Sequence, residues 1–314
     1  MANGIFSLPN EILLTVFDLC SSQELLRLTP TCPQFHTLIL RVMHNRLQVA
    51  AGLDGHALYF RCHHPSLDRQ SPKMFCAALK TDGLAELQTA IYDDESHLGQ
   101  VKSIFGLYSR FRPQLQEPTV RVVYRPMTGS RVYTDFNRIP APRPIDERVS
   151  DTITVDAHDL FSQLSTEILL GKREPERGIL VSMHPVSSGV LRVWREWLSK
   201  NCESRTWTDG EPVAVHRDAS IRPAVAPACV KATQDPCALW LADQNLGVKF
   251  NIKEKKLRQN VHLLSNEVES AVSYSIEFDE VLVRTSHLLL QLEQAQENIH
   301  SGSGKAIVFG SFRG

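Results

Sequence analysis

Apolar residues between Pro9 and Cys20 recur in pairs one helical turn apart, which places them on one side of an α-helix. Pro9 suits the first turn of that helix, where its missing N–H costs nothing. Ser22 can cap a second, short helix that Pro30 limits, and Pro33 can open a third. The apolar residues of the three predicted helices are Ile12, Leu13, Val16, Phe17 and Cys20, then Leu25, Leu26 and Leu28, then Phe35, Leu38, Ile39 and Val42.

A three-helix module of this size buries only a modest core by itself. Burial of a Leu, Ile or Phe side chain contributes roughly 1.5–3 kcal/mol, which so small a module cannot obtain for every apolar residue. The pattern therefore predicts a docking module whose remaining apolar surface is covered by a partner. The alternative is that these helices begin a larger helical core, in which Leu8, Ile12 and Phe17 pack on the rest of the chain.

Beyond the helices, strand and helix patterns are mixed. Alternation over residues 57–62 predicts a strand, residues 101–111 fit a helix, and residues 119–124 form a β-branched strand pattern. Residues 138–148 hold three prolines and both charge signs, so we expect an exposed loop. Residues 201–236 are also rich in proline and have little periodicity, which predicts a long irregular stretch.

The middle of the chain carries a second helical pattern. Residues 157–166 predict a short helix and residues 178–183 a buried strand. Apolar side chains over residues 190–198 then fall at helical spacing, with charged residues turned away. This pattern predicts a helix whose two tryptophans, Trp194 and Trp197, are core anchors.

The last part of the chain predicts strands followed by a helix. Residues 238–253 fit a hairpin, and residues 272–278 alternate as a half-buried strand. Asp279 could cap a long final helix, although residues 281–290 also permit a strand. Residues 305–309 are apolar enough to return as an edge strand. Antiparallel pairing is the natural inference, so we expect an α+β fold in which helices pack on a mostly antiparallel sheet; a β-sandwich body is the alternative.

Composition and charge limit the classes of binding partner that we expect. The 314-residue chain is 42% hydrophobic and 22% charged, and its net charge of −1 offers no field for nucleic acid or an anionic membrane. The sequence shows neither a secretory leader nor a run of about eighteen apolar residues. Seven widely spaced cysteines without CxxC indicate reduced thiols. We expect a soluble protein of the cytoplasm and/or nucleus, with no nucleic-acid or membrane partner.

Metal binding is not predicted. Cys62, His63, His64 and Cys76 could each ligate a metal, but their spacing lacks the close pairs of structural zinc sites. Neighbouring residues of a strand point to opposite faces, so the two histidines cannot easily share an ion. We expect a buried Cys62 and exposed histidines.

Catalysis is not predicted either. Asp156, His158 and Asp159 could form a triad with a distant serine, but the chain has no G-x-S-x-G elbow. A Ser or Cys beside His158 or His184 would favour a hydrolytic enzyme. Residues 302–305 lack the spacing of a phosphate-binding loop. We therefore expect no catalytic residues, no metal and no cofactor.

The N-terminal motif resembles the F-box. Its start, Leu-Pro-Asn-Glu, is followed by the two apolar pairs, by Leu-Leu-Arg-Leu and by Cys-x-x-Phe at the family's spacing, and the departures are Cys20, Glu24, Thr31 and Pro33. The resemblance implies an F-box over residues 4–50 that binds the Skp-type adaptor of a cullin ubiquitin ligase. It implies these adaptor-binding residues: Leu8, Pro9, Ile12, Leu13, Val16, Phe17, Leu25, Leu28 and Phe35.

The rest of the chain is similar to a group of filamentous-fungal F-box proteins. Residues 55–65, 161–164, 194–198 and 304–310 carry this likeness. It implies that residues 55–314 form a domain that recruits an unknown protein target for ubiquitination, without bond chemistry of its own. The other function consistent with the sequence is an adaptor-bound regulatory or ligand-binding module that has no ligase role.

Overall fold

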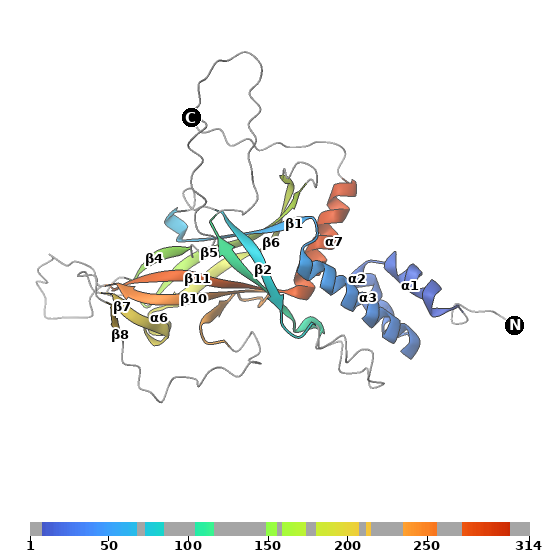
Figure 1. The fold of residues 1–314 in the computed structure, drawn as a ribbon, viewed down its shortest axis with the longest axis horizontal. Coiled ribbons are helices and arrows are strands. Elements are labelled where there is room, and N and C mark those ends of the chain that lie inside the picture. Colours follow the sequence, from blue (N-terminus) through green and yellow to red (C-terminus); the bar gives the residue numbers. More distant parts are fainter. Residues whose placement is uncertain are drawn as a thin grey trace, which may run out of the picture.

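The computed structural model describes residues 8–67, 73–84, 104–115, 149–155, 159–173, 180–206, 212–214, 235–255 and 272–301. Three helices at the N-terminus stand beside a large curved sheet, and a long C-terminal helix, α7 (Thr285–Ser301), lies between them (Figure 1). The fold is therefore α+β. Within the described part of the chain, no helix is long and apolar enough to cross a membrane.

The three predicted N-terminal helices are present as α1 (Asn10–Asp18), α2 (Ser22–Leu28) and α3 (Pro33–Gly52). The prediction that Ser22 caps α2 was wrong by one residue. Ser21 is the N-cap, because Glu24 three positions later completes a capping box with it. Pro33 occupies the first turn of α3 as predicted, with Cys32 as the N-cap.

The described strands form one 11-stranded sheet in the order β6-β5-β1-β2-β3-β11-β10-β7-β8, with β4 paired to β11 and β9 to β10. Apart from the parallel β10–β7 pair, the described strands pair antiparallel. The bounds are β1 His56–His63, β2 Met74–Thr81, β3 Tyr108–Gln114, β4 Ser150–Val155, β5 Phe161–Arg173, β6 Leu180–Trp194, β7 Cys202–Thr206, β8 Pro212–Ala214, β9 Ala238–Trp240, β10 Leu246–Lys255 and β11 Val272–Arg284.

The sheet curls until it is nearly a barrel (Figure 1). Its first strand, β6, comes back against β9. The approach is close, because a Cβ at Gly189 would lie 2.9 Å from a side-chain carbon of Leu241. The body is thus richer in strands than the sequence predicted and approaches the β-sandwich alternative, although its strands belong to a single curved sheet.

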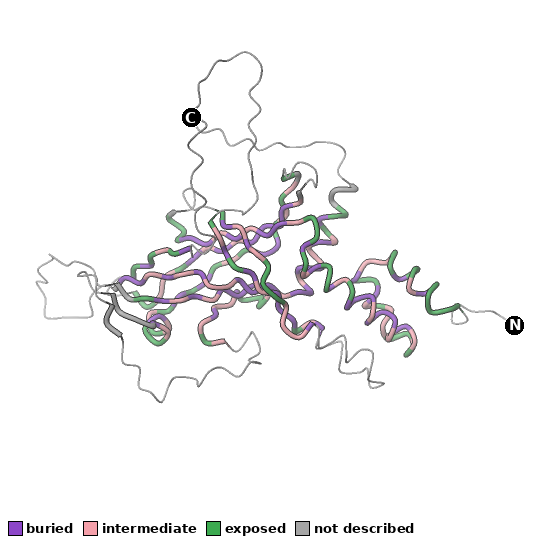
Figure 2. Tube along the Cα trace, in the orientation of Figure 1, coloured by how far each residue is buried: buried purple, intermediate pink, exposed green. Residues whose placement is uncertain are grey.

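Buried residues run through both parts of the molecule as one cluster (Figure 2). Inside the sheet, the Phe278 ring contacts Phe60 at 5.7 Å and Phe250 at 5.6 Å between centroids, and Phe250 contacts Trp197 at 6.1 Å. Large aromatic side chains therefore fill the space that the curved sheet encloses, which makes the interior a packed core.

Two predicted helices in the first half of the body are strands over part of their length, although Ile104 and Phe105 are helical as predicted. Residues 108–111 of the predicted helix 101–111 belong to β3, which pairs with β2 and β11. Residues 161–166 of the predicted helix 157–166 begin β5, which pairs with β1 and β6. Over residues 108–111 and 161–166 the neighbouring strands pair with the chain, so tertiary pairing overrides the local helical spacing there.

The predicted helix over residues 190–198 is also wrong in its first half. Strand β6 continues to Trp194, and the helix α6 covers only Arg195–Asn201. Because side chains of a strand alternate between faces, Val190 and Trp194 are 51% and 46% exposed. Trp194 is therefore no core anchor, whereas Trp197 packs on Phe250.

The C-terminal predictions hold more closely. The predicted hairpin is confirmed as β9 and β10. The strand predicted over residues 178–183 is present as the start of β6, but it is not buried as predicted, because Met183 is exposed. Strand β11 continues to Arg284, so α7 begins at Thr285 and not after Asp279. The strand alternative for residues 281–290 is correct as far as Arg284. Residues 119–124, 138–148, 207–211, 215–234 and 305–309 lie outside the described residues.

Candidate docking surface on the N-terminal helices

Four of the motif's apolar residues point into the helical module. Leu13, Phe17, Leu25 and Phe35 are buried, and the rings of Phe17 and Phe35 meet edge to face with centroids 5.0 Å apart. These four residues belong to the predicted adaptor-binding set. Their side chains instead join α1 and α2 to α3, so they shape the module from inside and do not form its surface.

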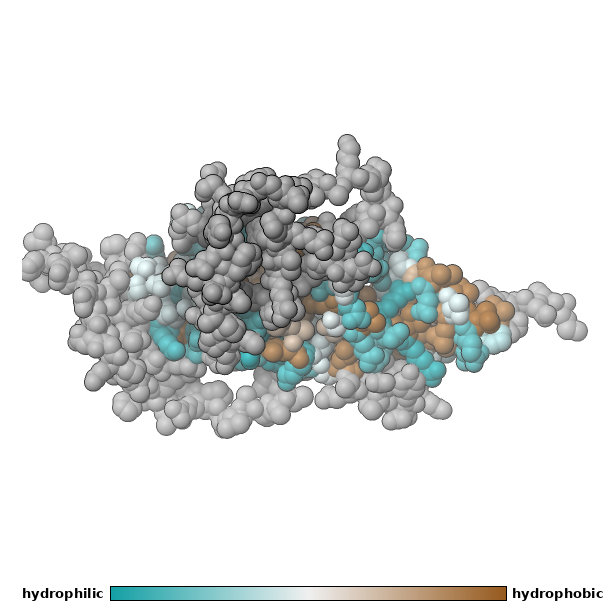
Figure 3. All heavy atoms as spheres, turned by 45° about the horizontal axis from the view of Figure 1, so that its top comes forward, coloured by the Kyte–Doolittle hydropathy of each residue, from teal (hydrophilic) through white to brown (hydrophobic). Residues whose placement is uncertain are grey.

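A second group of apolar residues, in and next to α1, points outward. Leu8, Ile12, Val16 and Leu19 are 38%, 50%, 42% and 86% exposed. Ile12 and Val16 share one side of α1, beside the buried face of Leu13 and Phe17, and Leu8 and Leu19 lie just before and just after the helix on that side. We call these four residues the outer stripe. Hydrophobic atoms gather at this end of the molecule in the space-filling view (Figure 3).

Two further residues of the predicted set are accessible: Pro9, which follows Leu8 in the sequence, is exposed, and Leu28 of α2 is partly buried. Leu19 was missed by sequence reasoning, although it continues the stripe three residues after Val16. Apolar stripes of this kind on a surface mark interaction sites more often than single exposed residues do. Of the alternative in which Leu8, Ile12 and Phe17 pack on the rest of the chain, the structure bears out only Phe17, which belongs to the core, whereas Leu8 and Ile12 are exposed.

The turn between α1 and α2 is held by local hydrogen bonds. The backbone N–H of Ser21 donates to Glu24 Oε2 at 2.8 Å, and the Ser21 hydroxyl donates to the same oxygen at 2.9 Å. These two bonds, the backbone one above all, lower the pKa of the Glu24 carboxyl. The capping box thus fixes the direction of α2 after the outer stripe ends.

Arg46 of α3 holds the C-terminal end of α1. Its Nη2 donates to the backbone carbonyls of Phe17 at 3.2 Å, Asp18 at 3.1 Å and Cys20 at 2.7 Å. The last carbonyls of a helix have no partner within the helix and carry partial negative charge, so a guanidinium is a suitable cap. Arg46 therefore fixes how the outer stripe is oriented on α3.

Glu293 of α7 connects this cap to the body. Its Oε1 lies 3.2 Å from Arg46 Nη1 and accepts from the Ser22 hydroxyl at 2.5 Å, while its Oε2 accepts from the Ser22 backbone N–H at 3.1 Å. Apolar residues of α7, including Leu288, Leu289 and Leu292, belong to the hydrophobic core that the helices share with the sheet. The orientation of the N-terminal helices is thus set by the C-terminal helix as well as by their own sequence.

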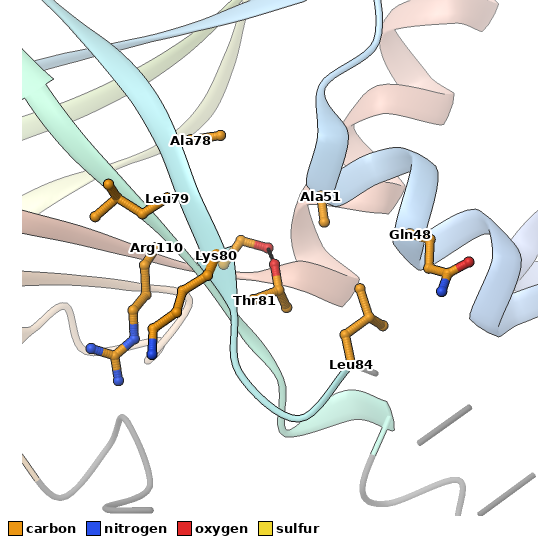
Figure 4. A pocket seen from close by; sticks show the side chains of 9 residues that line it. Gln48, Ala51, Ala78, Leu79, Lys80, Thr81, Leu84 and Arg110 are labelled. Carbon is orange, nitrogen blue, oxygen red and sulfur yellow. Dashed lines mark hydrogen bonds between the residues drawn. The ribbon is translucent and has the colours of Figure 1, made fainter. Parts of the chain in front are cut away.

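Two hollows adjoin the helices. The larger, about 460 Å³, lies between the end of α1, α3 and α7, and we call it the α3–α7 groove. The smaller, about 280 Å³, separates Gln48 and Ala51 of α3 from the end of β2 (Figure 4). Both cations lining the smaller hollow are paired, because Lys80 and Arg110 lie 3.0 and 2.6 Å from Asp82. Its two cationic groups are therefore already paired inside the chain.

The candidate metal ligands are not assembled. Cys62 and Cys76 are buried, and burial raises the pKa of both thiols well above the ordinary range. His64 is exposed as predicted. His63 is buried, so the prediction that both histidines are exposed was wrong for His63, which pairs with Ser165 of β5 inside the sheet. Among the described residues, no three His, Cys, Asp or Glu side chains are grouped as a metal would need.

The triad candidates are not brought together by the described residues. Asp159 is exposed, and Asp156 and His158 lie outside the described ranges, as do residues 302–305. His184 Nε2 lies 3.0 Å from the side-chain oxygen of Gln291, an amide that offers no nucleophile. The arrangement that would have favoured a hydrolase is thus not seen at His184.

Comparison of the chain with protein-family models, curated proteins and solved structures finds no match. Function is therefore inferred from the geometry of the N-terminal helices together with their sequence motif.

Proposed function

We propose that this chain is an F-box subunit of a Skp-cullin ubiquitin ligase. The outer stripe of α1 is the observation that supports this proposal most directly. A helix in a folded domain needs one apolar face, and α1 has two: Leu13 and Phe17 face the core, while Ile12 and Val16 face solvent. The second face has a physical explanation if a partner covers it, and the Leu-Pro-Asn-Glu motif at its start favours the Skp-type adaptor.

The proposal assigns different roles to the motif residues. Leu8, Pro9, Ile12 and Val16, with the exposed edge of Leu28, contact the adaptor. The buried residues hold the helices in the geometry that presents this surface, and they are Leu13, Phe17, Leu25 and Phe35.

The β-rich body would bind a protein target. The chain itself does no bond chemistry in this proposal, because holding a target beside the ubiquitin carrier raises its effective concentration and so its rate of modification. The Arg46–Glu293 connection supports such a role, since it joins the docking helices to α7 and, through it, to the sheet.

Binding of a purified Skp-type adaptor tests the proposal. Ile12→Asp/Val16→Asp places two charges on the outer stripe without touching the core. We expect affinity to fall at least about tenfold, because two apolar contacts of roughly 1.5–3 kcal/mol each are lost. Val190→Asp is the matched control, since Val190 and Ile12 are 51% and 50% exposed but lie on different elements. Equal binding by all three proteins would exclude the docking role.

A second measurement separates a ligase subunit from an adaptor-bound regulator. Proteins that bind the body are identified by proximity labelling in cells with the proteasome blocked, and their half-lives are measured with wild type and with Ile12→Asp/Val16→Asp. A ligase subunit predicts longer half-lives in the variant while labelling of the body's partners is unchanged. Equal half-lives with wild type and with the variant would indicate that the chain binds the adaptor but does not cause degradation of its partners.

A further inference from the structure

The α3–α7 groove begins where the outer stripe ends. Leu19 of the stripe and Val49 of α3, which is 53% exposed, both line it. Leu289 and Leu292 of α7 line it as well and belong to the buried core. Its volume of about 460 Å³ lies within the roughly 300–1,000 Å³ of cavities that hold ligands in proteins. The groove therefore has room for apolar side chains, and Leu19 and Val49 are the apolar surface that they would cover.

The charges that line the groove are mainly acidic. The acidic residues are Asp18, Asp54, Glu293 and Glu297, and the basic ones are Arg46 and His56. Arg46 is already bound to Glu293 and to three backbone carbonyls, and His56 Nδ1 donates to a backbone carbonyl at 2.9 Å. The side chains of Asp18, Asp54 and Glu297 are exposed and pair with none of the described residues. Three carboxylates therefore remain to attract a cation, and the complementary occupant is basic.

Two amide side chains favour a peptide over a simple cation. Asn45 of α3 and Gln296 of α7 also line the groove, and both are exposed. Neither side chain makes a hydrogen bond to any of the residues that the structure describes. A primary amide offers two N–H donors and one oxygen acceptor, which match the C=O and N–H groups of a peptide backbone. Carboxylates, amides and apolar side chains together fit a peptide in which apolar residues adjoin Lys or Arg.

We propose that the α3–α7 groove binds a short segment of a partner protein in which apolar side chains are flanked by Lys or Arg. The apolar side chains cover Leu19 and Val49, and the cations pair with Asp18, Asp54 and Glu297. The contact itself does not depend on the proposed function. That the partner is a protein recruited for ubiquitination does rest on it, and in that setting the groove holds the target next to the docking helices.

Two synthetic peptides serve as probes for the full chain. The basic probe is Gly-Lys-Leu-Phe-Lys-Leu-Arg-Gly, and the acidic probe has Glu in place of each Lys and Arg. Fluorescence anisotropy of the labelled probes gives their Kd values at low and at high salt. We expect the basic probe to bind at least about tenfold more tightly than the acidic one, and its affinity to fall with salt, because exposed charges are screened. Equal affinity for the two probes would overturn the proposal.

A charge reversal locates the binding. Asp54→Lys/Glu297→Lys should weaken binding of the basic probe at least about tenfold and make the acidic probe the tighter binder, which a misfolded groove would not do. Asp159→Lys/Glu196→Lys is the matched control, because it changes the net charge equally at exposed carboxylates that do not line the groove. An unchanged preference for the basic probe in Asp54→Lys/Glu297→Lys would show that the peptide binds elsewhere and would overturn the proposal.

The apolar part of the contact is tested without any change of charge. Leu19→Ser/Val49→Ser removes apolar surface at two exposed positions and leaves the core intact. We expect it to weaken binding of the basic probe at least about threefold, because less apolar surface is buried in the complex. Binding as tight as that of wild type would mean that charge alone attracts the peptide, which would contradict the proposed contact.

Sedimentation of the chain alone separates a partner protein from a second copy of the chain. A dimer that Asp54→Lys/Glu297→Lys dissociates would overturn the proposal, because the occupant would then be another copy. Adaptor binding keeps the two proposals apart, and we expect the same adaptor affinity for wild type and for Asp54→Lys/Glu297→Lys. If the basic probe binds and the adaptor does not, the proposed function fails and the groove contact stands. If the adaptor binds and neither probe does, only the groove contact fails.

Discussion

Arg46 Nη1 lies 3.2 Å from Glu293 Oε1, and this ion pair joins two residues that are 247 positions apart in the chain. Both side chains are mostly buried, with 17% and 22% of their surface exposed. Ion pairs on a protein surface contribute little, but this pair also satisfies backbone groups at the ends of α1 and α2. It therefore couples the helix that carries the outer stripe to the C-terminal helix.

Removing either partner should lower the free energy of unfolding by different amounts. We expect Arg46→Met to cost about 2–3 kcal/mol, because three helix-end carbonyls also lose their donor, and Glu293→Gln about 1 kcal/mol. Urea unfolding of both single variants and the double variant gives their coupling energy. Strictly additive costs would show that the pair transmits nothing between the helices.

Neighbouring residues of α1 should respond oppositely to truncation. Leu13 is fully buried and Ile12 is half exposed, so Leu13→Ala should cost about 2–5 kcal/mol of unfolding free energy and Ile12→Ala less than about 0.5 kcal/mol. Adaptor binding should show the reverse order once each protein is folded. Similar stability costs for the two variants would mean that α1 is rotated from the position seen here.

Which side of α1 faces outward could not be predicted from its sequence. Ile12 and Leu13 are adjacent and both apolar, so periodicity indicates a helix with a broad apolar face without saying where the core begins. The edge-to-face contact of Phe17 with Phe35 decides this, and it depends on where α3 packs. The existence of the three helices, by contrast, follows from local capping and proline positions that need no tertiary information.

The errors in the body have a related cause. Around residue 190, helical spacing and strand alternation fit the same residues, since Leu191 and Val193 are buried while Val190 and Trp194 are exposed. Pairing with β5 selects the strand. Sequence alone could not supply that choice, because the sequence of the partner strand also fits a helix over part of its length.

The capping box of α2 predicts a dependence of stability on pH. The folded state lowers the pKa of Glu24 from its ordinary 4.5, first through the Ser21 backbone N–H and then through its hydroxyl. The carboxylate therefore stabilises the folded state at pH values above its ordinary pKa. This contribution is lost as the pH falls through the pKa that Glu24 has in the folded state. Glu24→Gln keeps an acceptor at the N3 position but removes the charge.

We expect the difference in unfolding free energy between wild type and Glu24→Gln to be present near about pH 7 and to shrink below about pH 4.5. Urea titrations at a series of pH values measure it. A difference that stays constant down to about pH 3 would indicate that the Glu24 carboxylate makes no charge-dependent bond to Ser21.

The buried thiols of β1 and β2 should be inert in the native protein. Cys62 and Cys76 are 3% and 2% exposed, and burial, in Cys62 reinforced by Asp151, raises the pKa of each thiol. Alkylation requires an exposed thiolate, so both residues should react only through opening of the sheet, at least about 100-fold more slowly than Cys32. Iodoacetamide labelling with peptide mass spectrometry, repeated at increasing urea, measures the rates. The two rates should rise together with global unfolding, because β1 and β2 are paired. If Cys62 alone reacted as fast as Cys32 in native buffer, β1 would be open to solvent, and the Cys62–His63–His64 run would again be accessible to a metal ion.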